Sequence, residues 1–114
     1  MDSRLREEVL ILHANICEGL ADPTRILILY TLDERARNVT ELAGVLGITQ
    51  PTASRHLKIL RDRGMVVAER RAQAVVYSLT DRRVIEALDI LRTVLADGLQ
   101  SHGVLARSVI GELV

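Results

Sequence analysis

Hydrophobic residues in the first part of the chain recur with the three- and four-residue spacing of amphipathic helices. Between Leu5 and Leu20 this spacing predicts a first helix that is apolar on more than one side. Asp22 and Pro23 then match an N-cap followed by proline at the first helical position, which predicts a second helix ending near Leu32. We expect the second helix to bury Ile26, Leu27, Leu29 and Tyr30.

A charged loop over residues 33–37 and a short third helix are predicted next. Asn38 and Glu41 resemble a capping box, with asparagine in place of the usual serine or threonine. Gly47 fits the C′ position at which such a helix ends. The apolar residues expected to face the core from this helix are Leu42, Ala43 and Leu46.

A fourth helix is predicted directly after this turn. Thr49 is placed to cap it, and Pro51 is tolerated in the first turn because its missing N–H has no helical partner there. The helix is expected to run to about Arg63 and to end at Gly64. Its buried side is expected to contain Ala53, Leu57 and Leu60.

The hydrophobic period changes after Gly64. Residues 66–68 and 75–77 are rich in β-branched residues, and the polar bend at 69–74 between them predicts a hairpin. Thr80 or Asp81 can then cap a long last helix. The apolar positions of this helix form a regular seam at Val84, Leu88, Leu91, Leu95 and Leu99.

The order of these elements is that of a winged helix-turn-helix. We therefore expect a mainly α fold with a small β-hairpin (α+β), ordered α-α-α-α-β-β-α, in a single domain over residues 1–114. A chain of 114 residues buries a modest core, so extra burial in a dimer would stabilise it. The seam of the last helix suits helix–helix packing, and one apolar surface of the first helix could belong to a partner chain. Residues 101–114 are expected to form a C-terminal tail.

Composition narrows the possible functions. Fifteen basic residues balance fifteen acidic ones, yet residues 49–73 contain six basic and two acidic residues, a local charge of +4. Only two aromatic residues are present, which disfavours binding of single strands by base stacking. One cysteine, no signal peptide and no long apolar stretch predict a cytoplasmic protein without a membrane span.

The second helix of the predicted motif carries polar side chains near its N-terminus, where such helices enter the major groove. Gln50 suits adenine and Arg55 suits guanine, whereas threonines beside a helix N-terminus suit phosphate oxygens. Any one of these residues is as easily explained by a solvated surface, but six basic residues on two adjacent elements favour double-stranded DNA as the partner. The candidate DNA-binding residues, expected to be exposed, are Thr49, Gln50, Thr52, Ser54, Arg55, His56, Lys58, Arg70, Arg71 and Gln73.

Two segments resemble the ArsR/SmtB family of regulators. Leu20–Leu27 is similar to its opening signature, and Ser54–Val66 is similar to its recognition helix and following strand. The resemblance covers roughly residues 8–100 in order. It implies a homodimer whose interface uses the first and last helices, and a repressor that is released by an inducer. A dimer in turn implies a palindromic operator.

The resemblance also implies which positions contact bases. These are the positions of Gln50, Ser54 and Arg55, whereas Pro51 stands where a hydroxyl residue is common. The wing departs from the pattern as well, because residues 71–74 lack the frequent glycine at the tip.

Many members of this family sense metals or oxidants through three kinds of site, and the matching positions here lack the required ligands. At one of these sites Asp81 is retained, but Arg83 replaces a histidine ligand, and its positive charge would repel a metal ion. The other matching positions hold Asn38, Thr40, Val94, Tyr30 and Ala96. We therefore assign no metal site and no cofactor from the resemblance, and the inducer is not identified.

His13 and Cys17 lie four residues apart and therefore on one helical face. One hypothesis is a zinc-type site between two subunits, completed by His102 or by the second chain. The interpretation that we favour is a buried cysteine and a half-buried imidazole without a ligand. An inter-chain disulfide through Cys17 is a weaker third hypothesis.

Two other functions are weighed against DNA binding. A winged-helix module for protein–protein contacts would dock through the apolar segment Val104–Val114, but it would not need a polar recognition face. An enzyme would need a nucleophile, a base and an orienting group, and Ser54 and His56 on one helix do not supply that set. DNA-dependent regulation is therefore the predicted function, and no catalytic residue is assigned.

Overall fold

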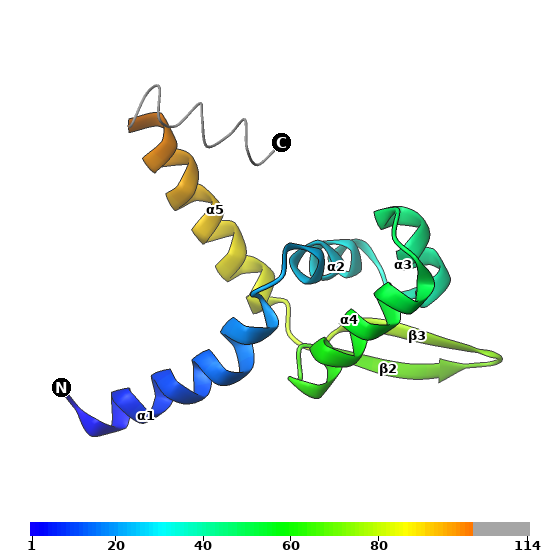
Figure 1. The fold of residues 1–114 in the computed structure, drawn as a ribbon, viewed down its shortest axis with the longest axis horizontal. Helices are drawn as coiled ribbons and strands as arrows, with labels where there is room; N and C mark the ends of the chain where they lie inside the picture. Colours follow the sequence, from blue (N-terminus) through cyan, green and yellow to red (C-terminus); the bar gives the residue numbers. More distant parts are fainter. Residues whose placement is uncertain (102–114) are drawn as a thin grey trace. The chain divides into compact units, whose positions relative to one another are not determined.

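A computed structural model describes residues 1–101, which belong to two compact units, residues 1–82 and residues 83–114. The first unit contains α1 (Ser3–Leu12), η1 (His13–Cys17), α2 (Pro23–Glu34), β1 (Arg37–Asn38), α3 (Val39–Leu46), α4 (Gln50–Asp62), β2 (Val66–Arg71) and β3 (Ala74–Leu79) (Figure 1). The second unit contains α5 (Arg83–Ser101). This order confirms the predicted winged helix-turn-helix and adds two elements, η1 and β1. His102 and the apolar segment at 104–114 lie outside the described residues.

The predicted caps start α2 and α3. The side chain of Asp22 accepts a hydrogen bond from the backbone N–H of Thr24 at 2.7 Å, and this bond holds the pKa of the Asp22 carboxyl below its usual value. The capping box of α3 has both of its bonds: Asn38 Oδ1 accepts from the Glu41 N–H at 2.8 Å, and the Asn38 N–H donates to Glu41 Oε1 at 3.1 Å. Asn38, which stands at a sensor position of the resembled family, is thus a helix cap in this chain.

Two glycines end the helices of the DNA-binding motif. Gly47 has φ of 67° and follows α3, and Gly64 has φ of 75° and follows α4. A left-handed conformation is disfavoured for residues with a Cβ atom, so glycine at both positions lets the chain turn sharply without strain.

The long first helix is interrupted. α1 gives way at His13 to the π-helical segment η1, which has one wider turn, before the chain reaches Gly19. The side-chain amide of Asn15 donates to the Ile11 carbonyl at 2.9 Å within this region. Hydrophobic spacing does not distinguish a π-turn from an α-turn, so the sequence predicted one continuous helix.

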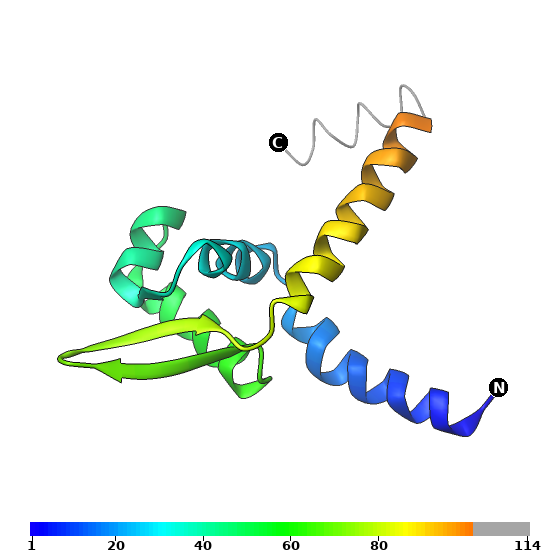
Figure 2. The ribbon, with the colours of Figure 1, turned by 180° about the vertical axis from the view of Figure 1, so that it is seen from behind.

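The hairpin belongs to a three-stranded antiparallel sheet in the order β1-β3-β2. β2 and β3 pair from Val66 opposite Leu79 to Arg71 opposite Ala74, and Figure 2 shows this hairpin extending beyond the helices of the same unit. β1 pairs with β3 through Arg37, opposite Tyr77. The predicted loop at 33–37 was therefore wrong at both ends, because α2 continues to Glu34 and Arg37 is part of a strand.

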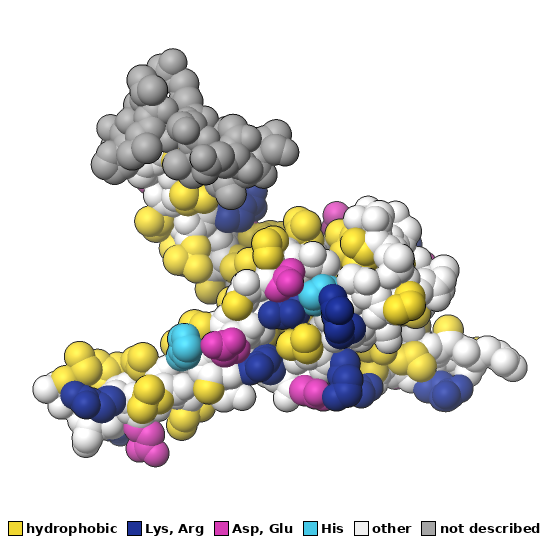
Figure 3. All heavy atoms as spheres, in the orientation of Figure 1, with side chains coloured by type: hydrophobic (Ala, Val, Ile, Leu, Met, Phe, Trp, Pro, Cys, Tyr) yellow, Lys and Arg dark blue, Asp and Glu magenta, His cyan; other side chains and the backbone are white. Residues whose placement is uncertain are grey.

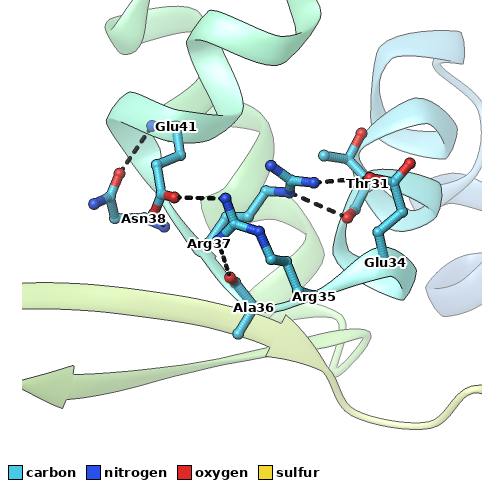
Figure 4. A network of polar contacts seen from close by, with 7 residues as sticks. All are labelled: Thr31, Glu34, Arg35, Ala36, Arg37, Asn38 and Glu41. Carbon is cyan, nitrogen blue, oxygen red and sulfur yellow. Dashed lines mark hydrogen bonds and ion pairs between the residues drawn. The ribbon is translucent and has the colours of Figure 1, made fainter.

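Polar contacts hold the connection between α2 and α3 in place (Figure 4). Arg37 is buried and donates from Nε to the Thr31 carbonyl at 3.3 Å, and its guanidinium pairs with Glu34 at 2.8 Å. Arg35 pairs with Glu41 at 3.0 Å and so links the end of α2 to the start of α3. A buried charge is tolerated when it is paired and hydrogen-bonded, which explains an arginine in a two-residue strand.

The core of the first unit is aliphatic. Its fully buried large side chains come from α2, α3, α4 and β2, and they are Ile28, Leu29, Leu42, Leu57, Leu60 and Val66. Most of the predicted core positions are buried, but Leu27 is 54% exposed and Ile28 occupies the core instead. The expectation for Leu27 was wrong because the buried residues of α2 are Ile28, Leu29, Thr31 and Leu32, which leaves Leu27 on the outer side of the helix.

α5 is amphipathic when it is considered alone. Ile85 and Leu88 are buried, whereas a group of large apolar side chains is exposed: Ile90, Leu91, Val94 and Leu95. Among the described residues, no helix combines the length and the apolar character that a membrane crossing needs.

We expect Leu29→Ala to lower the free energy of unfolding by about 2–5 kcal/mol, because a fully buried leucine is replaced and a cavity remains. Leu27→Ala removes the same atoms from an exposed site on the same helix and should cost less than about 1 kcal/mol. Urea denaturation followed by circular dichroism at one fixed protein concentration measures both. Equal losses for the two variants would contradict the burial pattern of α2.

Candidate nucleic-acid interface

α4 separates its apolar and polar residues on two sides. Ala53, Leu57 and Leu60 are fully buried on the inner side. The exposed side carries four of the six predicted contact residues of this helix, namely Gln50, Ser54, Arg55 and Lys58. Figure 3 shows Lys and Arg side chains gathered over α4 and a further cationic side chain on the hairpin. Burial of one side therefore presents the other side to a partner.

Two hydroxyls lie at the N-terminus of α4. Thr49 Oγ1 accepts from the Thr52 N–H at 3.3 Å and donates to Thr52 Oγ1 at 2.8 Å. Thr49 is exposed and Thr52 is partly buried. The helix N-terminus and its free N–H groups favour an anion at this position, which is the physical basis for a phosphate contact.

His56 is placed differently from the sequence prediction. Its side chain was expected on the exposed side of α4, but the residue is only 5% exposed, so that expectation was wrong. Its Nδ1 atom lies 3.2 Å from a guanidinium nitrogen of Arg25. Because Arg25 can only donate, Nδ1 is the acceptor and the neutral ring carries its proton on Nε2. Burial lowers the pKa of His56 below its usual value of 6.5, and the nearby Arg25 charge acts in the same direction.

Two arginines attach α4 to the end of the N-terminal helical segment. Arg25 donates to the carbonyls of Gly19 and Glu18 at 2.8 and 3.2 Å, in addition to its contact with His56. Arg63, which follows α4, donates to the Ala14 carbonyl and, at 3.5 Å, to the Asn15 carbonyl. Both guanidinium groups therefore stabilise the fold, although their charges also contribute to the basic surface.

A groove of about 450 Å³ runs between α4 and the hairpin. Its walls combine one side of α4 with one tyrosine of β3, and the lining residues are Pro51, Ser54, Arg55, Lys58, Arg61 and Tyr77. Three of these six residues are cations, so the groove favours an anionic occupant.

The basic residues of this region divide into two groups. Lys58 pairs with Asp62 at 2.8 Å, which lowers the pKa of that carboxyl, and Arg71 pairs with Glu69 at 3.3 Å. The second group makes no ion pair or hydrogen bond within residues 1–101, and it consists of Arg55, Arg61 and Arg70. The charges of this second group are not neutralised by partners in the described chain.

The register of the hairpin distinguishes its two arginines. Arg70 lies opposite Val75, and Val75 shares a face of β3 with Tyr77, which lines the groove. Arg71 lies opposite Ala74 and so belongs to the other face, where it contacts Glu69. Gln73 lies in the exposed turn between the strands. The sequence treated Arg70 and Arg71 as equivalent, but the sheet directs them to opposite sides.

Arg61 and Tyr77 were not among the predicted contact residues. Arg61 was counted only in the local charge, and Tyr77 was assigned to the hairpin. The helical spacing of Arg61 from Ser54 and Lys58 was a usable signal, since these residues share one side of α4. Tyr77 had no comparable signal, because its place in the groove depends on strand pairing.

His13 and Cys17 are both exposed in this protomer, so the favoured interpretation of a buried cysteine does not describe the single chain. Within the described part of the chain, no group of three or more potential metal ligands lies together. A site that requires His102 or a second subunit involves atoms outside the described residues, and it remains a hypothesis.

Comparison with known proteins places this arrangement among regulators. Residues 22–67 match the model of the family described as "Bacterial regulatory protein, arsR family". The chain is 37% identical over 89 residues to the HTH-type transcriptional regulator NmtR of Mycobacterium tuberculosis, covering 78% of this chain and 71% of NmtR. It is 35% identical over 81 residues to the Biofilm growth-associated repressor of Xylella fastidiosa, covering 71% of each.

A solved structure is similar over most of the chain. The homodimeric winged helix-turn-helix DNA-binding domain of Mb0332 from Mycobacterium bovis superposes with a TM-score of 0.75 at 26% identity. The match covers 90% of this chain and 94% of that domain. The predicted fold class is thereby confirmed by a homologous structure as well as by the element order.

We expect the free energy of unfolding to fall as the pH is lowered from about 7.5 to about 5.5. The pKa of His56 is lower in the folded state than its ordinary 6.5, so the unfolded chain takes up a proton that the folded chain resists. This contribution to stability is complete above the unfolded pKa and is lost as the pH falls towards the folded pKa. Urea titrations across this range should show a smaller pH dependence for His56→Gln, and an unchanged dependence would exclude His56 as its source.

Proposed function

The chain belongs to the arsR family of bacterial regulatory proteins, and on this basis we propose that it is a homodimeric repressor of transcription that binds a DNA operator. The observation that carries the proposal is the basic groove of α4 and the hairpin, with Arg55, Arg61 and Arg70 unpaired within the described residues. Such a protein acts in the cytoplasm, where bacterial DNA lies.

α4 supplies the contacts that distinguish one sequence from another. Gln50 and Arg55 are exposed on its outer side, and they pair with adenine and guanine edges in the major groove. Ser54 lies on the same side and lines the groove. Thr49 and Thr52 at the helix N-terminus contact phosphate and fix the register on the duplex. His56 has no direct part in this interface, because it is buried against Arg25.

The groove between α4 and the hairpin accommodates the sugar–phosphate strand. A helix in the major groove and a wing in the adjacent minor groove must have one DNA strand between them, and that strand is anionic. Arg61 offers an unpaired guanidinium there, and Tyr77 offers a hydroxyl. Arg70 extends the same cationic side along the hairpin, whereas Arg71 and Gln73 are peripheral.

The exposed apolar residues support assembly into a dimer. α1 buries none of its residues in the protomer and exposes Leu10 and Ile11, while α5 exposes Leu91 and Leu95. Exposed groups of large apolar side chains on each helix are costly in water and are typical of an interaction surface. The homodimer of the similar domain Mb0332 supports a second copy of this chain as the occupant.

Repression is supported by the name of the Xylella relative, and release by an inducer would make it conditional. The direct test is a mobility-shift titration with the DNA upstream of the coding region of this protein, followed by a screen for release with metals, oxidants and reactive sulfur compounds. In a footprint of the bound DNA we expect one symmetrical protected site, with half-sites about one helical turn apart or a multiple of it. No binding even at low salt would refute the proposal and favour a protein-interaction module.

Arg55→Ala should weaken operator binding by about 5- to 150-fold, since a bidentate contact with a base contributes about 1–3 kcal/mol. Arg70→Ala should weaken binding to all sequences and reduce the slope of log affinity against log salt by about 1. Fluorescence anisotropy with operator and scrambled duplexes at several salt concentrations measures both quantities. Arg71→Ala is the matched control, and an effect as large as that of Arg70→Ala would show that the wing does not bind in the direction given by its register.

Leu91→Glu should convert the dimer to a monomer and weaken operator binding, because it introduces a charge into the exposed apolar side of α5. Thr93→Glu introduces the same charge about 200° away on that helix and should leave the dimer intact. Sedimentation velocity gives the mass of each variant. A dimeric Leu91→Glu protein would contradict the assignment of α5 to the interface.

A further inference from the structure

The N-terminal helix is attached to the DNA-binding part of the protomer at its C-terminal end. α1 buries none of its ten residues, so tertiary packing within the protomer does not fix its direction. The chain then passes through η1 and reaches Gly19, which is buried. The contacts of η1 and of residues 18–20 therefore decide how α1 is oriented relative to α4.

Arg25 makes the first of these attachments from the N-terminal turn of α2. It is the third residue of α2, where the helix dipole disfavours a positive charge. Its guanidinium reaches back to the carbonyls of Glu18 and Gly19, at the C-terminal end of the preceding helical segment, where the dipole favours a cation. Its remaining nitrogen contacts His56 of α4 at 3.2 Å. One side chain thus joins the N-terminal segment to the recognition helix.

A second attachment lies at the C-terminal end of α4. Arg63 donates to the carbonyls of Ala14 and Asn15 in η1. Close packing accompanies it, since a Cβ atom at Gly19 would lie 2.0 Å from Met65 Cε and 3.2 Å from Arg63 Cδ. Met65 is itself buried, so little space is available for adjustment. Two polar contacts at η1 and one tight contact at Gly19 therefore hold this segment against the C-terminal end of α4 and the residues that follow it.

We propose that Arg25 and Arg63 are positioning residues, which fix the angle between the dimerisation helix α1 and the recognition helix α4 and thereby set the half-site spacing that the dimer accepts. This inference rests on the proposed homodimer and DNA operator. In a two-fold dimer built on α1, the separation of the two α4 helices is determined by how each α4 is oriented relative to its own α1. A change of one base pair in spacing moves a half-site by about 3.4 Å and about a tenth of a turn.

The expected size of the effect follows from the population of the correct orientation. If the attachment is removed, α4 samples other directions, and the apparent dissociation constant rises by the inverse of the fraction that remains correctly oriented. A fall of that fraction to about one tenth weakens binding to the optimal operator about tenfold. Binding to operators with one base pair more or less weakens by a smaller factor, because some of the new orientations fit them.

The test measures the affinity of full-length wild type, Arg25→Gln and Arg63→Gln for operators whose half-sites are separated by the natural spacing or by one base pair more or less. Arg35→Gln is the matched control, because Arg35 also contacts a carbonyl and a side chain but contacts neither η1 nor α4. Thermal unfolding and sedimentation establish that each variant is folded and dimeric. If one arginine variant does not fold, the other carries the same expectation.

We expect the wild type and Arg35→Gln to prefer the natural spacing by about tenfold or more, and both attachment variants to lose most of this preference while remaining dimers. An unchanged spacing preference in a folded attachment variant overturns the inference and leaves the proposed function intact. A lower salt dependence with unchanged preference also overturns it, because that result identifies a direct phosphate contact. Absence of DNA binding by the wild type refutes the proposed function and the inference with it.

Discussion

Burial of one side of α4 is the constraint on which the rest of this structure depends. Ala53, Leu57 and Leu60 are removed from water, and this removal determines that Ser54, Arg55 and Lys58 face outward. Removing large apolar side chains from water supplies much of the free energy that holds such a helix in place. His56 shares the inner side at the cost of a lowered pKa, and its contact with Arg25 compensates for part of that burial. The same packing that stabilises the domain therefore defines the interface.

Most of the fold could be predicted from the sequence because its signals are local. Asp22, Asn38 and Thr49 cap helices that begin one residue later, and Gly47 and Gly64 follow the last two of these helices. β1 was missed because a strand of two residues has no period, and because Arg37 is buried only through contacts with Thr31 and Glu34 of α2. The wider turn of η1 was missed because π- and α-turns place hydrophobic residues similarly.

The candidate site was predicted less completely, for a related reason. Residue type and helical spacing identified Gln50, Ser54 and Arg55, which are exposed on α4. The same reasoning gave His56 the wrong environment, because a polar side chain next to two others on a helix does not reveal a guanidinium partner 31 positions away. Tyr77 lines the site because β2 pairs with β3 and the hairpin packs beside α4. Such non-local contacts leave no mark in a short sequence window.

The neutral net charge of the chain is compatible with an anionic partner because charges differ in what they already contact. Lys58 and Arg71 are partly neutralised by Asp62 and Glu69, and Arg25 and Arg63 are engaged by backbone carbonyls. Exposed pairs of this kind are weak and are screened by salt, so Lys58 can exchange Asp62 for a phosphate at little cost. Long-range attraction of DNA is consequently modest, since it depends on net charge and its distribution. Affinity must then depend on close contacts in the groove, where Arg61 and Arg70 meet the strand directly. Discrimination between sequences depends instead on the base contacts of Gln50 and Arg55, because phosphate contacts carry no sequence information.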